Sequence, residues 1–311
     1  MARDGTVAVV GAGVIGAAVA YALARDGKDV LLLDRGEPGI LGASFGNAGH
    51  IAAELVEPLP SWKLLFSFWR ELFAIGGVLD IPVRRAPAFL PFALRFAAAA
   101  RHRAENTRHL APLVRPAAET MSRWLAEIGR SDLLRTNGHY QVWFGPRAHD
   151  RASAQARSME HLGIPTRPAP YDVVEALTGR TSTGAARSAL RSKDAAALWF
   201  PSTAHVRDPL KVVQSFAGAA RERGAAFNRA EVRAIEPHDQ GVRLNLGSET
   251  LSVGAAVICT GAWTEALLQP LGLRVPMESA RGYHVEMPDE PALTDTPILY
   301  EDDRILLTPM E

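Results

Sequence analysis

VAVVGAGVIGAAVAYALARDGKDVLLLD, residues Val7 to Asp34, is the stretch that decides the fold of this 311-residue chain. Residues 6–10 are a short, apolar, β-branched run, which predicts a buried strand, and Val30–Leu33 is a second run of this kind. Between them, Ala and Leu recur at helical spacing over residues 14–26, up to Gly27. The order of strand, helix and strand predicts a βαβ unit and a parallel sheet.

Three glycines at the first strand–helix junction form a G-x-G-x-x-G motif. The first permits a tight turn, the second lets backbone amides approach a pyrophosphate, and the third lets the helix lie close to the strand. The start of the helix then offers N–H groups and a positive dipole end to phosphates. The predicted nucleotide-binding residues of this unit are Gly11, Ala12, Gly13, Val14, Ile15, Gly16, Asp34 and Arg35.

Asp34 ends the second strand, where a carboxylate can accept hydrogen bonds from both ribose hydroxyls. Its charge disfavours the 2′-phosphate of NADP. The motif alone leaves FAD and NAD as alternatives.

Composition limits the classes of function. The 34 basic and 34 acidic residues give a net charge of zero, so we expect no nucleic-acid partner. The single cysteine, Cys259, excludes a disulfide framework and fits a reducing compartment. We recognise neither a signal peptide nor an apolar run long enough to span a membrane, and we expect a cytoplasmic protein. The nine histidines show no metal-ligand spacing, so we also expect no metal.

The stretch GASFGNAGHI, residues 42–51, resembles the FAD-dependent D-amino-acid dehydrogenases (small-subunit type) of the D-amino-acid oxidase superfamily. In that family a Ser-x-x-Asn-Ala-Gly-x-Ile run lines the pyrophosphate and the flavin. Position 50 is His here, where the family has Gln. The matching residues are Ser44, Asn47, Ala48, Gly49 and Ile51.

Three later segments are similar to the same family, so the resemblance covers nearly the whole chain. One matches a Gly-Ala-Trp turn that contacts FAD, one matches the crossing into the substrate domain, and one matches a backbone contact to the adenine. The residues concerned are Thr260, Gly261, Ala262 and Trp263 for the turn, Arg281, Gly282 and Tyr283 for the crossing, and Val232 for the adenine contact.

The resemblance implies an α/β fold, with a Rossmann-like FAD-binding domain interleaved with an antiparallel-sheet substrate domain. The implied segments are 1–57 and 209–274 for the FAD-binding domain, 58–145 for a helical, aromatic region and the start of the substrate domain, 146–208 mainly for the substrate domain, and 275–311 for the substrate domain again. Locally, the sequence predicts helices over 112–129, 147–162 and 209–223, and a strand over 139–144.

The resemblance also implies the activity, which is oxidative deamination of a D-amino acid to a 2-oxo acid and ammonia by hydride transfer to flavin N5. The cofactor carries this step, so we assign no catalytic residue. FAD should be bound non-covalently, because Gly46 stands where dimethylglycine-oxidising relatives carry a flavin-linked His. The candidate substrate contacts, for each of which a packing role is the alternative, are His50, Arg281 and Tyr283, and for Arg281 that alternative is holding the domain crossing.

Two alternatives stay open for the function. A sarcosine-type N-methyl amino-acid oxidase or dehydrogenase would use the same cofactor. A truncated, non-catalytic flavin-domain protein is the other, since the chain stops at RILLTPME, before a C-terminal stretch that family members have. We therefore expect an incomplete flavin site and an exposed sheet edge. The segments at 42–51 and 260–263 disfavour an NAD-dependent dehydrogenase.

An aromatic stretch has two interpretations. Trp62, Phe66, Trp69 and Phe73 recur at helical spacing, and an Arg-rich region follows. Such a helix suits a membrane interface, where a dehydrogenase could pass electrons to a quinone or an electron-transfer protein at the inner face of the plasma membrane. The alternative is a helix packed on its own domain.

Overall fold

The computed structural model describes residues 2–68, 72, 79–81, 84, 86–179, 194–288 and 294–311. The chain forms two compact units, each assembled from three segments. Unit 1 comprises Met1–Asn47, Glu127–Leu133 and Asp208–Val285, and unit 2 comprises Ala48–Ala126, Leu134–Arg207 and Glu286–Glu311. The two are described separately.

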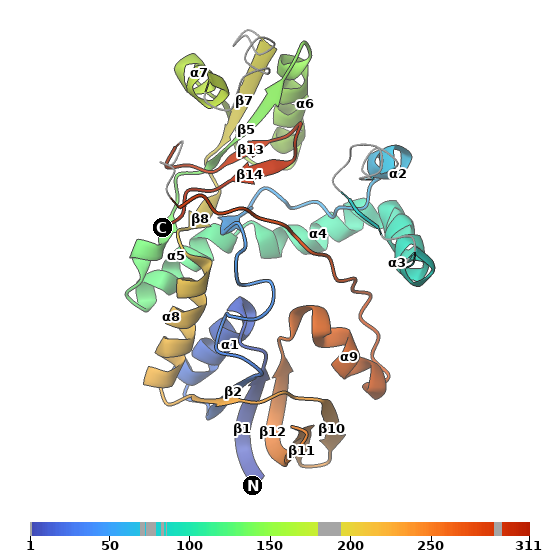
Figure 1. The fold of residues 1–311 in the computed structure, drawn as a ribbon, viewed down its shortest axis with the longest axis vertical. Coiled ribbons are helices and arrows are strands. Elements are labelled where there is room, and N and C mark those ends of the chain that lie inside the picture. The colour runs from blue at the N-terminus through green and yellow to red at the C-terminus, as the bar shows by residue number, and fades with distance from the viewer. Residues whose placement is uncertain are drawn as a thin grey trace. The chain divides into compact units, whose positions relative to one another are not determined.

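Unit 1 is built on a six-stranded sheet with the order β10-β11-β12-β1-β2-β9 (Figure 1). The strands β12, β1, β2 and β9 run parallel, whereas β10, β11 and β12 pair antiparallel. Apolar side chains from both parts fill one core, which includes Val10, Leu33 and Leu244. The bounds are β1 Ala2–Val10, β2 Val30–Asp34, β9 Ala226–Arg229, β10 Ala234–His238, β11 Gly241–Asn245 and β12 Thr250–Ile258.

Helices α1 (Val14–Arg25) and α8 (Pro209–Glu222) of unit 1 pack against each other. The rings of Tyr21 and Phe216 lie 5.9 Å apart between centroids, and both side chains are buried. The Tyr21 hydroxyl donates a hydrogen bond of 2.6 Å to Oε1 of Glu127, which ties the short middle segment of unit 1 to α1. Short helical turns complete the unit: η5 Ser131–Leu133, η8 Gly261–Trp263, α9 Thr264–Leu268 and η9 Gln269–Leu271.

Unit 2 contains two sheets, with the orders β14-β13-β5-β7-β6 and β3-β8-β4. All their strand pairs are antiparallel except β13 with β5. The strand bounds are β3 His50–Ile51, β4 Leu134–Arg135, β5 His139–Phe144, β6 Arg167–Pro168, β7 Ala195–Phe200, β8 Ala204–Val206, β13 Ile298–Tyr300 and β14 Ile305–Leu307.

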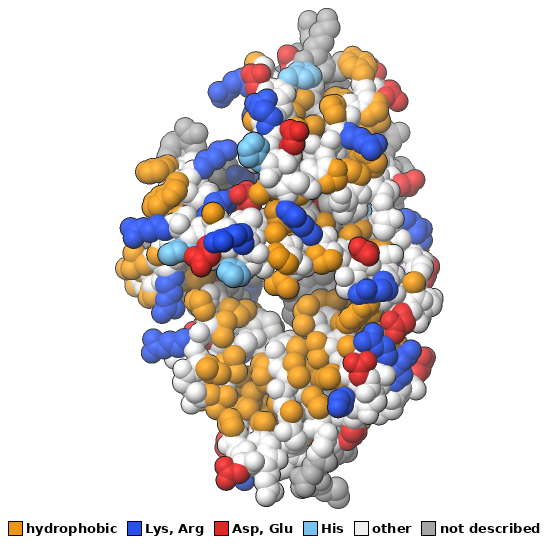
Figure 2. Space-filling model, turned by 180° about the vertical axis from the view of Figure 1, so that it is seen from behind, with side chains coloured by type: hydrophobic (Ala, Val, Ile, Leu, Met, Phe, Trp, Pro, Cys, Tyr) orange, Lys and Arg blue, Asp and Glu red, His pale blue; other side chains and the backbone are white. Residues whose placement is uncertain are grey.

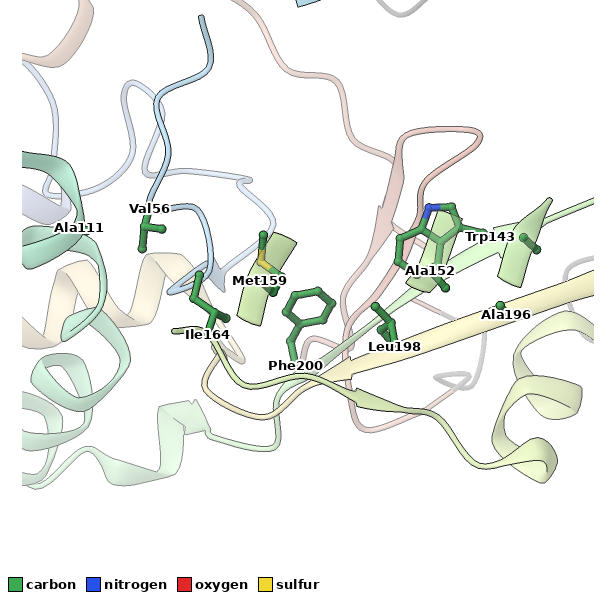
Figure 3. Close-up of a cluster of buried hydrophobic side chains, with 10 residues drawn as sticks. Val56, Ala111, Trp143, Ala152, Met159, Ile164, Ala196, Leu198 and Phe200 are labelled. Atoms are coloured by element: carbon green, nitrogen blue, oxygen red, sulfur yellow. The ribbon is translucent and has the colours of Figure 1, made fainter. Parts of the chain in front are cut away.

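The helices of unit 2 are α2 Trp62–Ser67, α3 Ala86–Ala99, η4 Ala100–His102, α4 Arg103–Val114, α5 Ala117–Glu127, α6 Ala148–His161 and α7 Tyr171–Gly179. A buried cluster packs α6 against β5 and β7, with Trp143, Met159 and Phe200 among its members (Figure 3).

The fold class that we predict is confirmed, since parallel and antiparallel sheets occur with helices in a mixed α/β arrangement. Two details differ. The expected antiparallel sheet contains the parallel pair of β13 and β5. The helix predicted over 112–129 is two helices, because the ring of Pro116 would clash with the carbonyl of Pro112 in a continuous helix. The carbonyl of Pro116 instead accepts from the Thr120 amide at 2.8 Å, in the first turn of α5.

Of the helices that the structure describes, none has the length and apolar character needed to cross a membrane. In the aromatic stretch, Trp62 and Phe66 lie on α2, while Trp69 and Phe73 fall outside the described residues.

Candidate functional site

At the first strand–helix junction, between β1 and α1, the backbone leaves no room for a side chain on Gly11. Gly11 has φ +102°, and a Cβ there would lie 2.4 Å from the carbonyl oxygen of Cys259. Its amide donates to the Leu33 carbonyl at 2.7 Å, and the Cys259 amide donates to the Val10 carbonyl at 2.7 Å. The carboxyl ends of β1, β2 and β12 are thereby held side by side around a backbone that only glycine can form.

The start of α1 is equally tight. A Cβ on Gly16 would lie 1.7 Å from the Gly11 carbonyl oxygen, so the helix can approach the strand only because residue 16 is glycine. Gly13 is the N-cap and offers no capping side chain. The Val14 amide donates to the Ser44 hydroxyl at 2.9 Å. The positive end of the dipole of this 12-residue helix lies at the same place.

Asp34 lies at the end of β2 with its carboxylate against the glycine turn. Its Oδ2 accepts from the Ala12 amide at 2.7 Å and its Oδ1 accepts from the Gly36 amide at 2.9 Å. Each oxygen keeps a further lone pair, so the carboxylate can still accept hydroxyl groups. The Ala230 amide donates to the Asp34 carbonyl at 2.8 Å, which brings the segment leading to Val232 to the same sheet edge.

The loop of residues 42–47 follows β2 and is held by its own side chains. The Asn47 amide group donates to the Ala43 and Ser44 carbonyls at 3.2 and 3.0 Å. A Cβ on Gly42 would lie 3.5 Å from Cζ3 of Trp263. The guanidinium carbon of Arg35 lies 4.2 Å from the centroid of the same Trp263 ring. Loop 42–47 and the Gly-Ala-Trp turn therefore meet at one edge of the unit 1 sheet.

This edge fits a dinucleotide such as FAD. The close approach of β1, α1 and β12 at Gly11 and Gly16, where any Cβ would collide with backbone oxygens, is the tight turn that such a site requires. The start of α1 suits phosphates, and Asp34 suits ribose hydroxyls. Thr260, whose hydroxyl lies 3.1 Å from that of Thr264, begins the turn that carries Trp263. Burial raises the pKa of the Cys259 thiol beside it, so this cysteine is no reactive thiolate at neutral pH.

Other predicted site residues lie elsewhere. Ala48, Gly49 and His50 belong to unit 2, and Gly49, with φ +60°, packs against the carbonyl oxygen of Val206. Arg281 and Tyr283 are exposed on the extended segment 273–285 of unit 1, and the side chain of Tyr283 is 93% exposed. The substrate contacts assigned to Arg281 and Tyr283 stay predictions.

A buried polar group in unit 2 contains one predicted site residue, His50, beside residues that the sequence analysis does not assign to the site. His139 and His205 are fully buried on β5 and β8, and Glu54 is buried beside His50. Burial lowers the pKa of His139 and of His205 to about 4. Sequence spacing gives no sign of this group, because strand pairing brings together positions far apart in the chain.

Comparison with known proteins extends these observations. The sequence profile of the family described as FAD dependent oxidoreductase matches residues 6–311. A D-amino acid dehydrogenase of Cereibacter sphaeroides is 29% identical over 292 residues, covering 91% of this chain and 64% of the relative. A D-amino acid dehydrogenase of Rhizobium johnstonii is 25% identical over 328 residues, covering 97% of this chain and 72% of the relative. The chain thus spans about two thirds of the length of these curated relatives.

Solved structures share the fold. Glycine oxidase from Geobacillus kaustophilus superposes with a TM-score of 0.57 at 22% identity, covering 97% of this chain and 66% of that one. L-proline dehydrogenase from P. horikoshii superposes with a TM-score of 0.54 at 15% identity, covering 88% and 57%.

Proposed function

The chain belongs to the family of FAD-dependent oxidoreductases, and from this premise we propose that it takes part in the oxidative deamination of D-amino acids to 2-oxo acids and ammonia. The substrate class is that of the curated relatives, which are named D-amino acid dehydrogenases. The chain spans only 64% of the first of these relatives. Its activity is therefore proposed, whereas its membership of the family is shown.

The observation that carries the proposal is the meeting of four separate segments at one edge of the unit 1 sheet. The Gly11 turn, the Asp34 carboxylate, loop 42–47 and the Trp263 turn are joined there by the contacts described above. We propose that FAD is held by Gly11, Ala12, Gly13, Val14, Ile15, Gly16, Asp34, Arg35, Ser44, Asn47, Ala48, Gly49, Val232, Thr260, Gly261 and Trp263.

Each part of this edge has a distinct task. The Asp34 carboxylate accepts the ribose hydroxyls, and the amides at the start of α1 compensate the pyrophosphate charge. FAD, when bound, supplies the acceptor for the hydride that leaves Cα of the amino acid, and water hydrolyses the resulting imine. Arg281 and Tyr283 are proposed to bind the substrate carboxylate. His50 instead faces the buried Glu54 carboxylate within unit 2.

The cofactor is proposed to be non-covalent. At Gly46, with φ +62°, a Cβ would lie 2.6 Å from Cε1 of His284. A histidine able to link to flavin therefore has neither the conformation nor the space at this position. Denaturing the yellow protein and filtering it should release all of the flavin; flavin retained on the protein would contradict this assignment.

The substrate class is tested by anaerobic titration of the purified chain with D-alanine, L-alanine and N-methylglycine, following the visible absorbance of the bound flavin. We expect bleaching by D-alanine and none by L-alanine. Bleaching by N-methylglycine alone would replace D-amino acids by N-methyl amino acids as the substrate. Bound flavin that no amino acid reduces would favour the non-catalytic alternative.

We also propose that electrons leave to a quinone or an electron-transfer protein, with the protein at the cytoplasmic face of the membrane. Support comes from the exposed side chains of unit 2. Trp62 and Phe66 on α2 are 50% and 80% exposed, and Leu90 and Leu94 on α3 are 55% and 64% exposed. Arg95 and Arg101 are exposed nearby in the chain. Figure 2 shows apolar and basic side chains close together at the left, where α3 of Figure 1 lies when seen from behind.

Flotation with anionic liposomes at low salt tests the membrane contact. The wild type should float, and replacing both Trp62 and Phe66 by Ser should leave it at the bottom of the gradient. Leu273→Ser is the control, because Leu273 is a 56% exposed apolar residue of unit 1. A wild type that does not float would exclude this contact.

A further inference from the structure

Three potential metal ligands lie together inside unit 2. Nε2 of His50, on β3, is 3.5 Å from Oε1 of Glu54, and Nε2 of His139, on β5, is 3.8 Å from the same oxygen. The ligand atoms of the three residues all lie within 4.8 Å of one another. The exposed fraction of the side chains is 12% for His50, 5% for Glu54 and zero for His139.

The hydrogen bonds of Thr203 fix the tautomer of His139. The Thr203 hydroxyl donates to the Phe200 carbonyl at 3.1 Å, so its oxygen accepts from Nδ1 of His139 at 2.9 Å. The proton of the neutral ring is therefore on Nδ1, and Nε2 carries a lone pair. With the proton on Nδ1, the lone pair of Nε2 points towards Glu54.

Inside unit 2, the lone pair of Nε2 of His139 therefore faces the carboxylate of Glu54, which is also an acceptor. Nε2 of His139, Oε2 of Glu54 and Nδ1 of His50 make no hydrogen bond with any described residue. Leaving such atoms unpaired is unfavourable, and more so for a charged group. The ring of His139 is fixed by stacking on Phe200 with centroids 4.6 Å apart, so it cannot turn away. A cation between the three residues would be bound by Nε2 of His50, Oε1 of Glu54 and Nε2 of His139.

We propose that His50, Glu54 and His139 bind one divalent transition-metal ion of the zinc type. Bonds of about 2.0–2.1 Å in a tetrahedron place neighbouring ligand atoms roughly 3.4 Å apart. The observed 3.5 and 3.8 Å therefore require only small side-chain shifts to close on an ion. Two imidazoles and one carboxylate form a ligand set typical of zinc and its neighbours in the first row.

The surrounding contacts match those of metal-ligating histidines. Such a histidine usually donates its other ring N–H to a fixed acceptor, as His139 does to Thr203. The ion would join β3, through His50, to β5, through His139, and the strands hold these two ligands in place, while Glu54 lies in the turn after β3. The proposal contradicts our expectation from the sequence of a protein without metal, because His139 is remote in sequence from the other two ligands.

The chain provides a matched surface control. Nδ1 of His102 lies 3.5 Å from Oε2 of Glu105, the same separation as for His50 and Glu54, but the two side chains are 66% and 55% exposed. An ion bound merely by a nearby His and Glu would occupy both places. An ion that needs the three buried ligands would bind only at His50, Glu54 and His139.

The test is zinc binding by the purified 311-residue chain, measured by elemental analysis and by titration of chelator-treated protein against a competing dye. We expect one equivalent of zinc, retained in His102→Ala. In Glu54→Gln the amide can donate to Nε2 of His139, so the chelator-treated variant should melt as the wild type does. It should nevertheless lose zinc affinity by about a hundredfold or more, since a ligand is worth at least as much as an outer contact.

A second variant tests the site without removing any ligand, in case Glu54→Gln fails to fold. Thr203→Val keeps the ligands but removes the acceptor that orients His139, and we expect it to lower zinc affinity by about 10–100-fold. Zinc should also raise the melting temperature of the wild type and of His102→Ala, and leave Glu54→Gln unchanged. Absence of zinc binding, or zinc binding of undiminished affinity in Glu54→Gln and Thr203→Val, would overturn the proposal.

Discussion

At the scale of single residues, the glycines of the first junction do different work from other glycines of the chain. Gly11 and Gly16 face backbone carbonyl oxygens at distances that no Cβ can occupy. Gly218, inside α8, has no atom within 4 Å of the position of a Cβ. The same substitution should therefore have opposite effects at two glycines of the same unit.

Gly16→Ala should prevent α1 from approaching β1, and with it the binding of FAD. We expect a loss of about 1–3 kcal/mol in the free energy of unfolding, as for an overpacked core, together with loss of bound flavin. Gly218→Ala should raise the free energy of unfolding by about 0.5–1 kcal/mol, because glycine is unfavourable inside a helix. Urea unfolding and the ratio of flavin to protein measure both effects. A yellow, stable Gly16→Ala protein would contradict this reading of the junction.

The predictability of a residue depends on whether its role is local. The spacing of Gly11, Gly16 and Asp34 reflects one turn and two adjoining strands, so the sequence alone indicates their place. His139 meets Glu54 only because β3, β5 and β8 come together in unit 2. No local pattern encodes that meeting, which is why the sequence gives an expectation of no metal.

At the scale of elements, the predicted ranges of helices and strands differ from the observed ones mainly where an element begins or ends. The strand predicted over 139–144 has those bounds, and helix 209–223 ends one residue early. The 112–129 period was interrupted by Pro116, a backbone effect that side-chain periodicity does not contain.

The start of α8 depends on one capping side chain. Asp208 accepts from the Lys211 amide at 2.9 Å, and Pro209 follows it at the first helical position. Asp208→Ala should lower the free energy of unfolding by about 1 kcal/mol, whereas Asp208→Asn, which can still cap, should cost only a few tenths. Urea unfolding of the two variants checks this; equal losses would contradict a capping role.

The side chain of Asp302 holds the hairpin of β13 and β14 against the rest of unit 2. Its carboxylate accepts from the Phe144 amide at 2.8 Å and pairs with Arg151, with Nη2 and Oδ2 3.2 Å apart. Burial acts to raise the pKa of Asp302, but the hydrogen bonds from Arg151 and Phe144 and the charge of Arg151 outweigh it, so the pKa is lowered.

A lowered pKa in the folded state means stability that is present above the unfolded pKa, about 4, and is lost as the pH falls through the folded value. Asp302→Asn should therefore be less stable than the wild type by about 1 kcal/mol at pH 7, since the pair is partly exposed. The difference should shrink as the pH falls below the unfolded pKa and through the lowered folded pKa of Asp302. Thermal melts from pH 7 to pH 3 measure it, with the exposed neighbour Asp303→Asn as control. A difference independent of pH would refute the charge interaction.

At the scale of the whole molecule, each unit is assembled from three separated pieces of chain. The motifs at residues 11–16 and 260–263 lie at opposite ends of the sequence, yet both belong to unit 1. The strands that precede the two motifs, β1 and β12, pair in parallel, and the interleaved fold is what the family resemblance of these motifs predicts. The bounds of the pieces, such as the short segment Glu127–Leu133, have no sequence signal and follow from contacts such as that of Tyr21 with Glu127.

The pairing of β1 with β12 joins two strands that are synthesised far apart in time. Val7 is registered with Ala255, so the first strand made has one neighbour that is among the last. At about 5–20 residues per second, roughly 250 residues separate these strands by on the order of 10–50 seconds. During that interval an apolar, β-branched strand leaves the ribosome with one flank unpaired.

Nascent chains arrested after residue 200 should therefore remain open to protease near β1, and chains arrested beyond β12, with that strand outside the tunnel, should be protected. Protection of β1 in the shorter chains would contradict this order. Because β1 waits for a partner strand made about 250 residues later, the yield of folded protein should depend on chaperones that bind nascent chains rather than on the stability of the finished fold.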